Sequence, residues 1–192
     1  MERSESKYFV TAGKMDEALV DLLGEKDFAY ITVKEICARA GVNRSTFYLH
    51  YETIEDLLTE CMEYLDRQFF SYFEENSGDF VRAIPSMKPE DLILVNRHYL
   101  IPYLSYIRDN LKVFQATLKH PEALQAEERY RRLNQYIVDP ILERHGVPVE
   151  KRPFYKAYFL NGILAVIQEW IREECKQSPE EVSDIIEGLV VR

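Results

Sequence analysis

Apolar residues recur at helical spacing through most of the chain, and this periodicity is the feature that most restricts its fold. The segment 179–190 is a clear instance, because Val182, Ile185, Ile186 and Leu189 follow an i, i+3, i+4, i+7 pattern. Only seven Gly and eight Pro occur among the 192 residues, and most of the Pro lie between periodic segments. The sequence therefore predicts an all-α fold of about nine helices.

The composition favours a soluble protein of a reducing compartment. Cys37, Cys61 and Cys175 are widely spaced and form no ligand pattern, which argues against a disulfide framework or a zinc site. The N-terminus has no apolar signal core, and no run of about 18 apolar residues occurs. We expect a cytoplasmic protein that has no membrane contact, no metal and no cofactor.

Residues 32–51 contain the signals of two short helices joined by a tight turn. Thr32 and Glu35 are spaced as a capping box, in which each side chain bonds a free backbone amide of the first helical turn. Gly41 can adopt the left-handed conformation that ends this helix, and Asn43 is a favoured N-cap for the next one. This pattern predicts a helix-turn-helix.

The second helix of this pair presents a surface suited to an anionic partner. Residues 42–51 contain no carboxylate, although the chain has a net charge of −9 and residues 1–58 hold seven Lys/Arg and eleven Asp/Glu. We expect Val42, Phe47 and Leu49 to pack inward. Arg44 would then face a guanine edge and the Thr46 methyl a thymine methyl. The predicted DNA-binding residues are Thr32, Lys34, Asn43, Arg44, Ser45, Thr46, Tyr48 and His50, of which Thr32, Lys34, Tyr48 and His50 would meet phosphates.

The run TVKEICARAGVNRSTFYLHYETIEDLL, residues 32–58, resembles the DNA-binding segment of TetR-type transcriptional regulators. The family pattern there has a Thr-led helix, an A-x-x-A-G-V turn, then S/T-x-x-Y and a His or Lys before an aromatic residue. It ends in a capped helix with two Leu, which are Leu57 and Leu58 in this sequence. The resemblance implies a helix-turn-helix domain at 1–52 and a helical ligand-binding and dimerisation domain at 53–192. At Ile54 the family usually has a phosphate-binding Lys, so we expect weaker DNA binding with a shallower salt dependence.

Beyond residue 75 the family shares its fold rather than its sequence. The stretch FYKAYFLNGILAVIQEWI is similar to a type common in Gram-positive members, among them regulators of dihydroxyacetone-kinase operons, and favours a bacterial source. The resemblance implies that the last two helices form a homodimer interface, which would hold two recognition helices about 34 Å apart on a palindromic operator. The predicted interface residues are Gly162, Val166, Trp170, Ile185, Ile186 and Leu189.

An aromatic surplus in the middle of the chain indicates a pocket for an unknown small-molecule effector. The residues predicted to line it are Tyr99, Tyr103, Tyr106, Phe114, Tyr136, Asn161 and Gln168. SGDFVRAIPSMKP, residues 77–89, is the one stretch that resembles a linker, and residues 122–144 have a helical pattern.

The sequence holds no catalytic constellation, so we do not expect an enzyme. The four His lack metal-binding spacing, and neither a Gly-rich phosphate loop nor a nucleophile elbow is present. We expect a dimeric DNA-binding transcriptional regulator, acting as a repressor that a small molecule releases. The alternative is a co-regulator that acts through a protein partner, with weak or lost DNA binding.

Overall fold

The computed structural model describes residues 2–92, 95–122, 124, 131–132 and 134–190. Within these residues the protein has nine α-helices and no strand, which confirms the predicted all-α class. The α-helices are α1 (Glu2–Glu25), α2 (Val33–Ala40), α3 (Arg44–His50), α4 (Ile54–Ala83), α5 (Arg97–Asp109), α6 (Leu111–Lys119), α8 (Asp139–Arg144), α9 (Arg152–Arg172) and α10 (Pro179–Val190). None of the described helices combines the length and the apolar composition that crossing a membrane requires.

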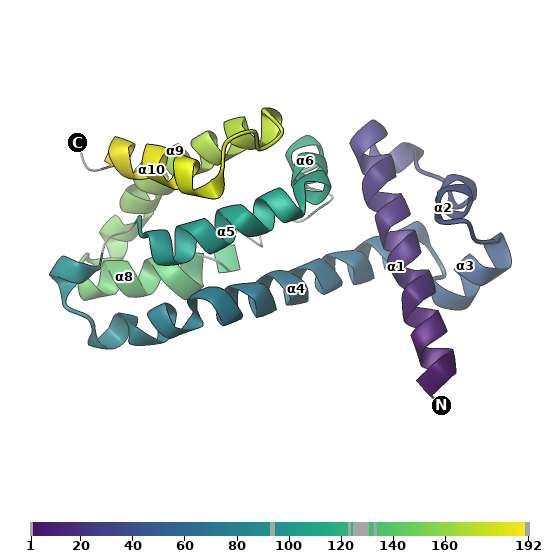
Figure 1. Cartoon of the computed structure of the whole chain (residues 1–192), viewed down its shortest axis with the longest axis horizontal. Coiled ribbons are helices and arrows are strands. Elements are labelled where there is room, and N and C mark those ends of the chain that lie inside the picture. Colours follow the sequence, from purple (N-terminus) through teal and green to yellow (C-terminus); the bar gives the residue numbers. More distant parts are fainter. Residues whose placement is uncertain (1, 93–94, 123, 125–130, 133, 191–192) are drawn as a thin grey trace. The chain divides into compact units, whose positions relative to one another are not determined.

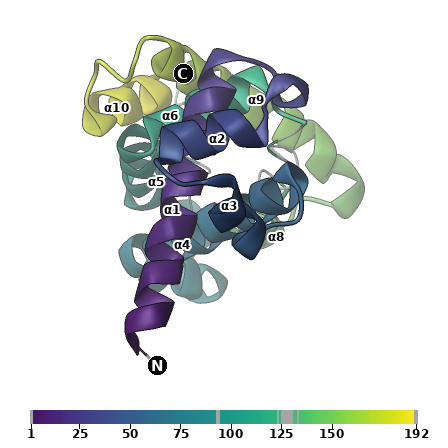
Figure 2. The same cartoon turned by 90° about the vertical axis from the view of Figure 1, so that its right-hand side faces the viewer.

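The chain divides into two compact units. The first comprises Met1–Arg67 together with Gln115–Leu124, so it extends past residue 52 into α4 and includes a segment from the middle of the chain. Within it α2 packs on α1, and α3 packs on α2 (Figure 2). Fully buried apolar side chains from α1 to α4 form its core: Met15, Leu19, Leu23, Ile36, Phe47 and Leu57.

The mid-chain segment is tied to the C-terminal end of α1. The Lys119 ammonium donates to the Gly24 carbonyl at 2.5 Å, and the His120 Nε2 atom lies 3.0 Å from the Leu23 carbonyl oxygen. Carbonyls in the last turn of a helix have no intrahelical partner, so these side chains satisfy acceptors that would otherwise face solvent.

Helix α4 is longer than the sequence predicts. It continues through Ser77 and Gly78 to Ala83, so the linker expected at 77–89 is wrong over its first half. Ser77 is buried, and its hydroxyl donates to the carbonyl of His98 at 2.9 Å. A polar residue can thus occupy a buried helix position when another element satisfies its hydroxyl. The chain then passes through two 3₁₀ turns, Ile84–Ser86 and Pro89–Asp91.

The second unit comprises Gln68–Phe114 and Gln125–Arg192. Helix α10 packs on α5 and α9 (Figure 1). A capping box starts α10, because the Glu181 amide donates to the Ser178 hydroxyl at 3.2 Å and the Ser178 amide to the Glu181 carboxylate at 2.7 Å. Buried residues of α4, the two 3₁₀ turns that follow it, α5 and the segment 134–142 form a core of this unit: Phe69, Phe73, Ile84, Leu92, Tyr106, Ile137, Val138, Ile141 and Leu142.

The helix predicted over 122–144 is only partly described, because residues 123, 125–130 and 133 lie outside the described residues. The described part differs from a regular α-helix. Asn134–Val138 forms a π-helical turn, and α8 follows it directly. A π turn accommodates one extra residue and changes which side chains face inward. Here it buries Asn134 together with Ile137 and Val138.

Candidate nucleic-acid interface and ligand pocket

Helix α2 begins with the predicted capping box. The Glu35 amide donates to the Thr32 hydroxyl at 3.4 Å, and the Thr32 amide donates to the Glu35 carboxylate at 3.0 Å. The Lys26 ammonium lies 2.5 Å from the same carboxylate. The Lys26 hydrogen bond, followed by that from Thr32, lowers the pKa of Glu35 to about 2. Glu35 is therefore ionised, and the Lys26 ammonium balances its charge.

Gly41 forms the turn between α2 and α3. Its backbone lies in the left-handed region, with φ of 68° and ψ of 33°. The Gly41 amide donates to the Cys37 carbonyl, and the Val42 amide donates to the same oxygen at 3.0 Å. A Cβ atom at residue 41 would meet no atom within 4 Å. The turn thus requires glycine for its conformation and not for space.

Asn43 organises the first turn of α3. Its side-chain oxygen accepts from the Thr46 amide at 2.7 Å, from the Thr46 hydroxyl at 2.8 Å and from the Ser45 hydroxyl at 2.6 Å. The cap predicted for Asn43 is confirmed. Both hydroxyls are donors in these bonds, so their oxygens keep acceptor capacity toward solvent.

The outward face of α3 carries most of the residues predicted to contact DNA. Arg44 and Ser45 are exposed, and Tyr48 is 59 % exposed. Phe47 is fully buried, as expected, but Leu49 is 79 % exposed, so the prediction that Leu49 packs inward is wrong. Residues two apart on a helix point in nearly opposite directions, and Phe47 and Leu49 cannot both face the core. Tyr51, four residues after Phe47, fills the inner position instead.

His50 lies differently from the other predicted contacts. Its ring is half-buried and stacks on Tyr8 of α1, with ring centroids 3.9 Å apart. Its buried Nδ1 atom has no hydrogen-bond partner in the described part of the chain, and burial lowers the pKa of the imidazole. A neutral, stacked ring holds the end of α3 against α1. The structure does not support His50 as a cation for phosphate.

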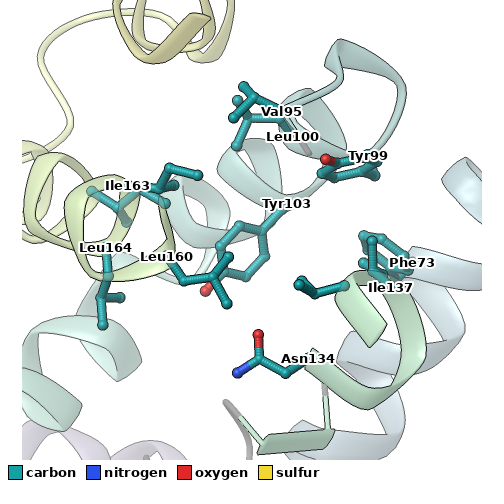
Figure 3. A pocket seen from close by; sticks show the side chains of 12 residues that line it. Phe73, Val95, Tyr99, Leu100, Tyr103, Asn134, Ile137, Leu160, Ile163 and Leu164 are labelled. Atoms are coloured by element: carbon teal, nitrogen blue, oxygen red, sulfur yellow. The ribbon is translucent and has the colours of Figure 1, made fainter. Parts of the chain in front are cut away.

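A pocket of about 80 Å³ lies within the second unit. Side chains from α4, α5, the π turn and α9 surround it, as Figure 3 shows. Its lining is almost entirely apolar: Phe73, Val95, Tyr99, Leu100, Tyr103, Asn134, Ile137, Val138, Leu160, Ile163, Leu164 and Ile167. Tyr99 and Tyr103, two of the seven residues predicted for an effector pocket, are among these lining residues.

The other five predicted pocket residues lie outside this lining. Tyr106 is buried in an aromatic cluster, with its ring centroid 5.2 Å from that of Phe69 and 6.2 Å from that of Phe114. The Tyr136 hydroxyl donates to the Glu74 carboxylate at 2.7 Å. Asn161 is exposed on α9 and Gln168 is half-buried. Aromatic content alone does not separate core positions from pocket positions.

Asn134 lines the pocket, and the sequence analysis missed it. It is 8 % exposed and shares the apolar stripe of Ile137, Val138 and Ile141. A polar residue at the i position of an i, i+3, i+4, i+7 apolar pattern was the available signal. This signal was missed because residues 122–144 contain many other polar residues, and Asn134 did not differ from them in type.

The residues predicted for a dimer interface divide into two groups. Ile185 is 49 % and Leu189 65 % exposed, and Gly162 is exposed as well. Trp170 and Ile186 are buried inside the protomer, so their assignment to an interface is wrong. The Trp170 indole donates to the Gln177 carbonyl at 3.1 Å and packs the turn between α9 and α10. Val166 is half-buried.

Two aromatic residues of α9 are exposed, unlike the buried Trp170 of the same helix. Phe154 is 75 % exposed and Tyr158 is 79 % exposed. Together with Ile185 and Leu189 they form the α9/α10 apolar surface. Large apolar residues left exposed on two helices that pack together favour a protein interface on these helices.

Comparisons with known proteins agree with this architecture. Residues 17–61 match the family described as bacterial regulatory proteins, tetR family, and residues 97–192 match a family described as a transcriptional regulator C-terminal region, TetR type. The chain is 26 % identical over 183 residues to YxbF, an uncharacterised HTH-type transcriptional regulator of Bacillus subtilis strain 168. The match covers 92 % of this chain but only 44 % of that protein, so the chain spans less than half the length of this curated relative.

Solved structures share the fold. A transcriptional regulator of the TerR/AcrR family from Aquifex aeolicus VF5 superposes with a TM-score of 0.64 at 20 % identity, over 94 % of this chain and 98 % of the other. The dihydroxyacetone kinase operon activator DhaS has a TM-score of 0.55 at 19 % identity, over 95 % of each chain. The fatty acid degradation regulator FadR from Bacillus halodurans has a TM-score of 0.56 at 15 % identity, over 93 % of each chain.

Proposed function

The chain belongs to the TetR family of bacterial regulatory proteins, and we propose that it is a DNA-binding transcriptional regulator whose recognition helix is α3. The face of α3 that carries Arg44, Ser45 and Tyr48 would contact the DNA. The observation that carries this proposal is the exposure of that face on a helix whose first turn is fixed by the Asn43 cap. Side chains presented from a rigid first turn reach base edges in the major groove at low entropic cost.

The proposed contacts divide by chemistry. Arg44 is the base reader, because a guanidinium can donate two hydrogen bonds to a guanine edge, and the Thr46 methyl meets a thymine methyl. Ser45 assists from the same turn. Lys34, Thr32 and Tyr48 contact phosphates, which orient the protein without reading sequence. Asn43 and His50 serve by positioning α3.

Binding to fragments from the region upstream of the protein's own gene tests these roles by fluorescence anisotropy at several salt concentrations. Arg44→Ala should weaken specific binding about 5- to 150-fold and relax preference at one base position. Lys34→Ala should weaken binding to all sequences and reduce the salt slope by about one. Lys151→Ala is the control, an exposed cation of the second unit.

Equal losses in Arg44→Ala and Lys151→Ala would contradict the assignment of α3. An absence of sequence-specific binding by the unaltered protein would favour the alternative, a co-regulator that acts through a protein partner.

We further propose that the α9/α10 apolar surface joins two copies of the chain, so that two α3 helices meet a palindromic operator. The reason is the exposure of three large apolar side chains, Leu189, Ile185 and Tyr158. Side chains of this kind are usually covered by a partner when they lie together on a protein surface. Gly162 lies exposed on the same helix as Tyr158, where the missing side chain permits close approach of a partner helix. Trp170 and Ile186 support this surface from beneath.

Sedimentation velocity tests the dimer. Leu189→Arg should convert the dimer to monomer, because a cation would be buried without a partner. Tyr30→Arg is a matched control, since Tyr30 is 70 % exposed but lies in the first unit. A dimer that survives Leu189→Arg combined with Tyr158→Arg would place the interface elsewhere.

The pocket of the second unit is the proposed effector site, and the proposed output is a repressor that releases DNA on ligand binding. A ligand can shift this equilibrium only by its difference in affinity for the two states. A thermal-shift screen of metabolites, followed by DNA release for each hit, measures that difference. Leu160→Phe should fill the pocket and abolish the response while the protein stays folded. A hit that still acts on Leu160→Phe would exclude this pocket.

A further inference from the structure

Asn134 contributes an amide to the wall of the pocket. The residue is 8 % exposed and lines the pocket; its amide is not among the side-chain groups sealed from solvent without a partner, so it is open to the pocket, and no hydrogen bond joins it to another described side chain. The two other polar lining residues are Tyr99, whose hydroxyl bonds to the backbone of Asn96, and Tyr103, which also has a partner. A polar amide in an otherwise apolar wall leaves a hydrogen-bonding group for water or a ligand in the pocket to satisfy.

The backbone conformation at Asn134 also indicates a ligand site. Asn134 is the first residue of the π turn, and this turn directs it inward together with Ile137 and Val138. π turns are rare and less favourable than α-helix, and they are found often at functional sites. In Figure 3 the Asn134 amide and the Tyr103 hydroxyl point into the same space, facing Leu160 of α9. Two independent features, an amide open to the pocket and an irregular helix, therefore meet at one wall of the pocket.

The charge of the lining restricts what can bind there. No Asp, Glu, Lys, Arg or His occurs among the described residues that line the pocket. Burying a carboxylate or an ammonium group without a counter-charge is strongly unfavourable. An uncharged ligand with an apolar body pays no such penalty, and one hydroxyl or carbonyl group would complete the hydrogen bonding of Asn134.

We propose that the pocket binds a small, uncharged molecule with a compact apolar body and a single hydroxyl or carbonyl group, which hydrogen-bonds to the Asn134 amide. This rests on the proposed function insofar as the pocket is the effector site. The volume of about 80 Å³ limits the part of the ligand that is enclosed. Since an apolar cavity of about 150 Å³ holds benzene, the pocket encloses only part of a five- or six-membered ring.

Three probes with the same ring size represent an alcohol, a hydrocarbon and a carboxylate: cyclopentanol, cyclopentene and cyclopentanecarboxylate. Dissociation constants are measured by ligand-observed NMR on the full chain at neutral pH. Cyclopentanol should bind about tenfold more tightly than cyclopentene, because the hydrocarbon offers the Asn134 amide no hydrogen bond. Cyclopentanecarboxylate should bind at least tenfold more weakly than cyclopentanol.

The variant Asn134→Leu tests the residue. It should reverse the preference, because the alcohol would then bury its hydroxyl against an apolar wall, and the hydrocarbon should bind at least as tightly as before. Asn161→Leu is the matched control, since Asn161 is an exposed Asn of α9 that does not line the pocket. It should leave all three constants unchanged.

The following binding results would overturn the inference. Tighter binding of the carboxylate or the hydrocarbon to the unaltered protein would refute the ligand class, and so would binding of none of the probes. An unchanged preference in Asn134→Leu would refute the residue. DNA release is measured separately: if cyclopentanol binds through Asn134 without changing DNA affinity, the ligand class stands and the effector role of the pocket fails.

Discussion

Replacing Asp16 by Asn should stabilise the protein at neutral pH. Asp16 lies in α1, where its Oδ1 atom is buried without a hydrogen-bond partner in the described part of the chain. Burial, followed by repulsion from Glu60, raises the pKa of this carboxyl from 3.8 to about 6, although a hydrogen bond with Cys61 opposes the rise. Asn has nearly the same shape and no charge, so the substitution removes the cost of ionisation alone.

The magnitude and sign follow from the two pKa values. A difference of one in pKa corresponds to about 1.4 kcal/mol, so a rise from 3.8 to about 6 amounts to about 3 kcal/mol at most. Partial solvent exposure reduces this to about 1–2 kcal/mol. Below pH 3.8 the carboxyl is protonated in both the folded and the unfolded state, and it costs nothing. As pH rises through 6 the folded state loses the stability that protonation had provided.

Urea denaturation at pH values from about 4 to 8 measures the free energy of unfolding of each protein. The variant and the unaltered protein should agree near pH 4, and Asp16→Asn should be more stable by about 1–2 kcal/mol above pH 7. Glu52→Gln serves as the control, because Glu52 is exposed and its replacement should change the free energy of unfolding by no more than about 0.5 kcal/mol. A constant difference between Asp16→Asn and the unaltered protein across this range would refute the reasoning.

Three further predictions concern the helix-turn-helix, and each is checked by the free energy of unfolding. Thr32→Ala should cost about 1 kcal/mol, because it removes the capping hydroxyl of α2. Gly41→Ala should cost about 1 kcal/mol or more through backbone strain at positive φ, and an unchanged stability would contradict the turn geometry. Phe47→Ala should cost about 3–5 kcal/mol while Leu49→Ala stays within about 0.5 kcal/mol, and comparable losses would refute the orientation of α3.

The local structure of the DNA-binding segment was predictable residue by residue. Thr32 and Glu35 cap α2, Gly41 makes the left-handed turn, and Asn43 caps α3, each as its spacing predicted. These signals act over three or four residues, and their partners lie in the same stretch of sequence. No tertiary contact is needed to recognise them.

The side on which a residue packs was less predictable. Leu49 and Trp170 are both large and apolar, yet one is 79 % exposed and the other 4 %. Hydrophobicity indicates that a side chain favours burial, but not whether it packs within the protomer or against a partner. For Ser77 the deciding factor is a carbonyl 21 residues away, that of His98, which accepts its hydroxyl and allows α4 to continue.

The sequence by itself determined the helical class, the boundaries of α2 and α3 and the outward chemistry of α3, because helix periodicity and capping are local properties of the chain. The tertiary structure alone decided which aromatic residues line the pocket, which apolar residues stay exposed on α9 and α10, and where Asn134 points. The physical reason is that these properties depend on what the other helices leave uncovered. Asn134 faces an apolar pocket only because α4, α5 and α9 surround it with apolar side chains.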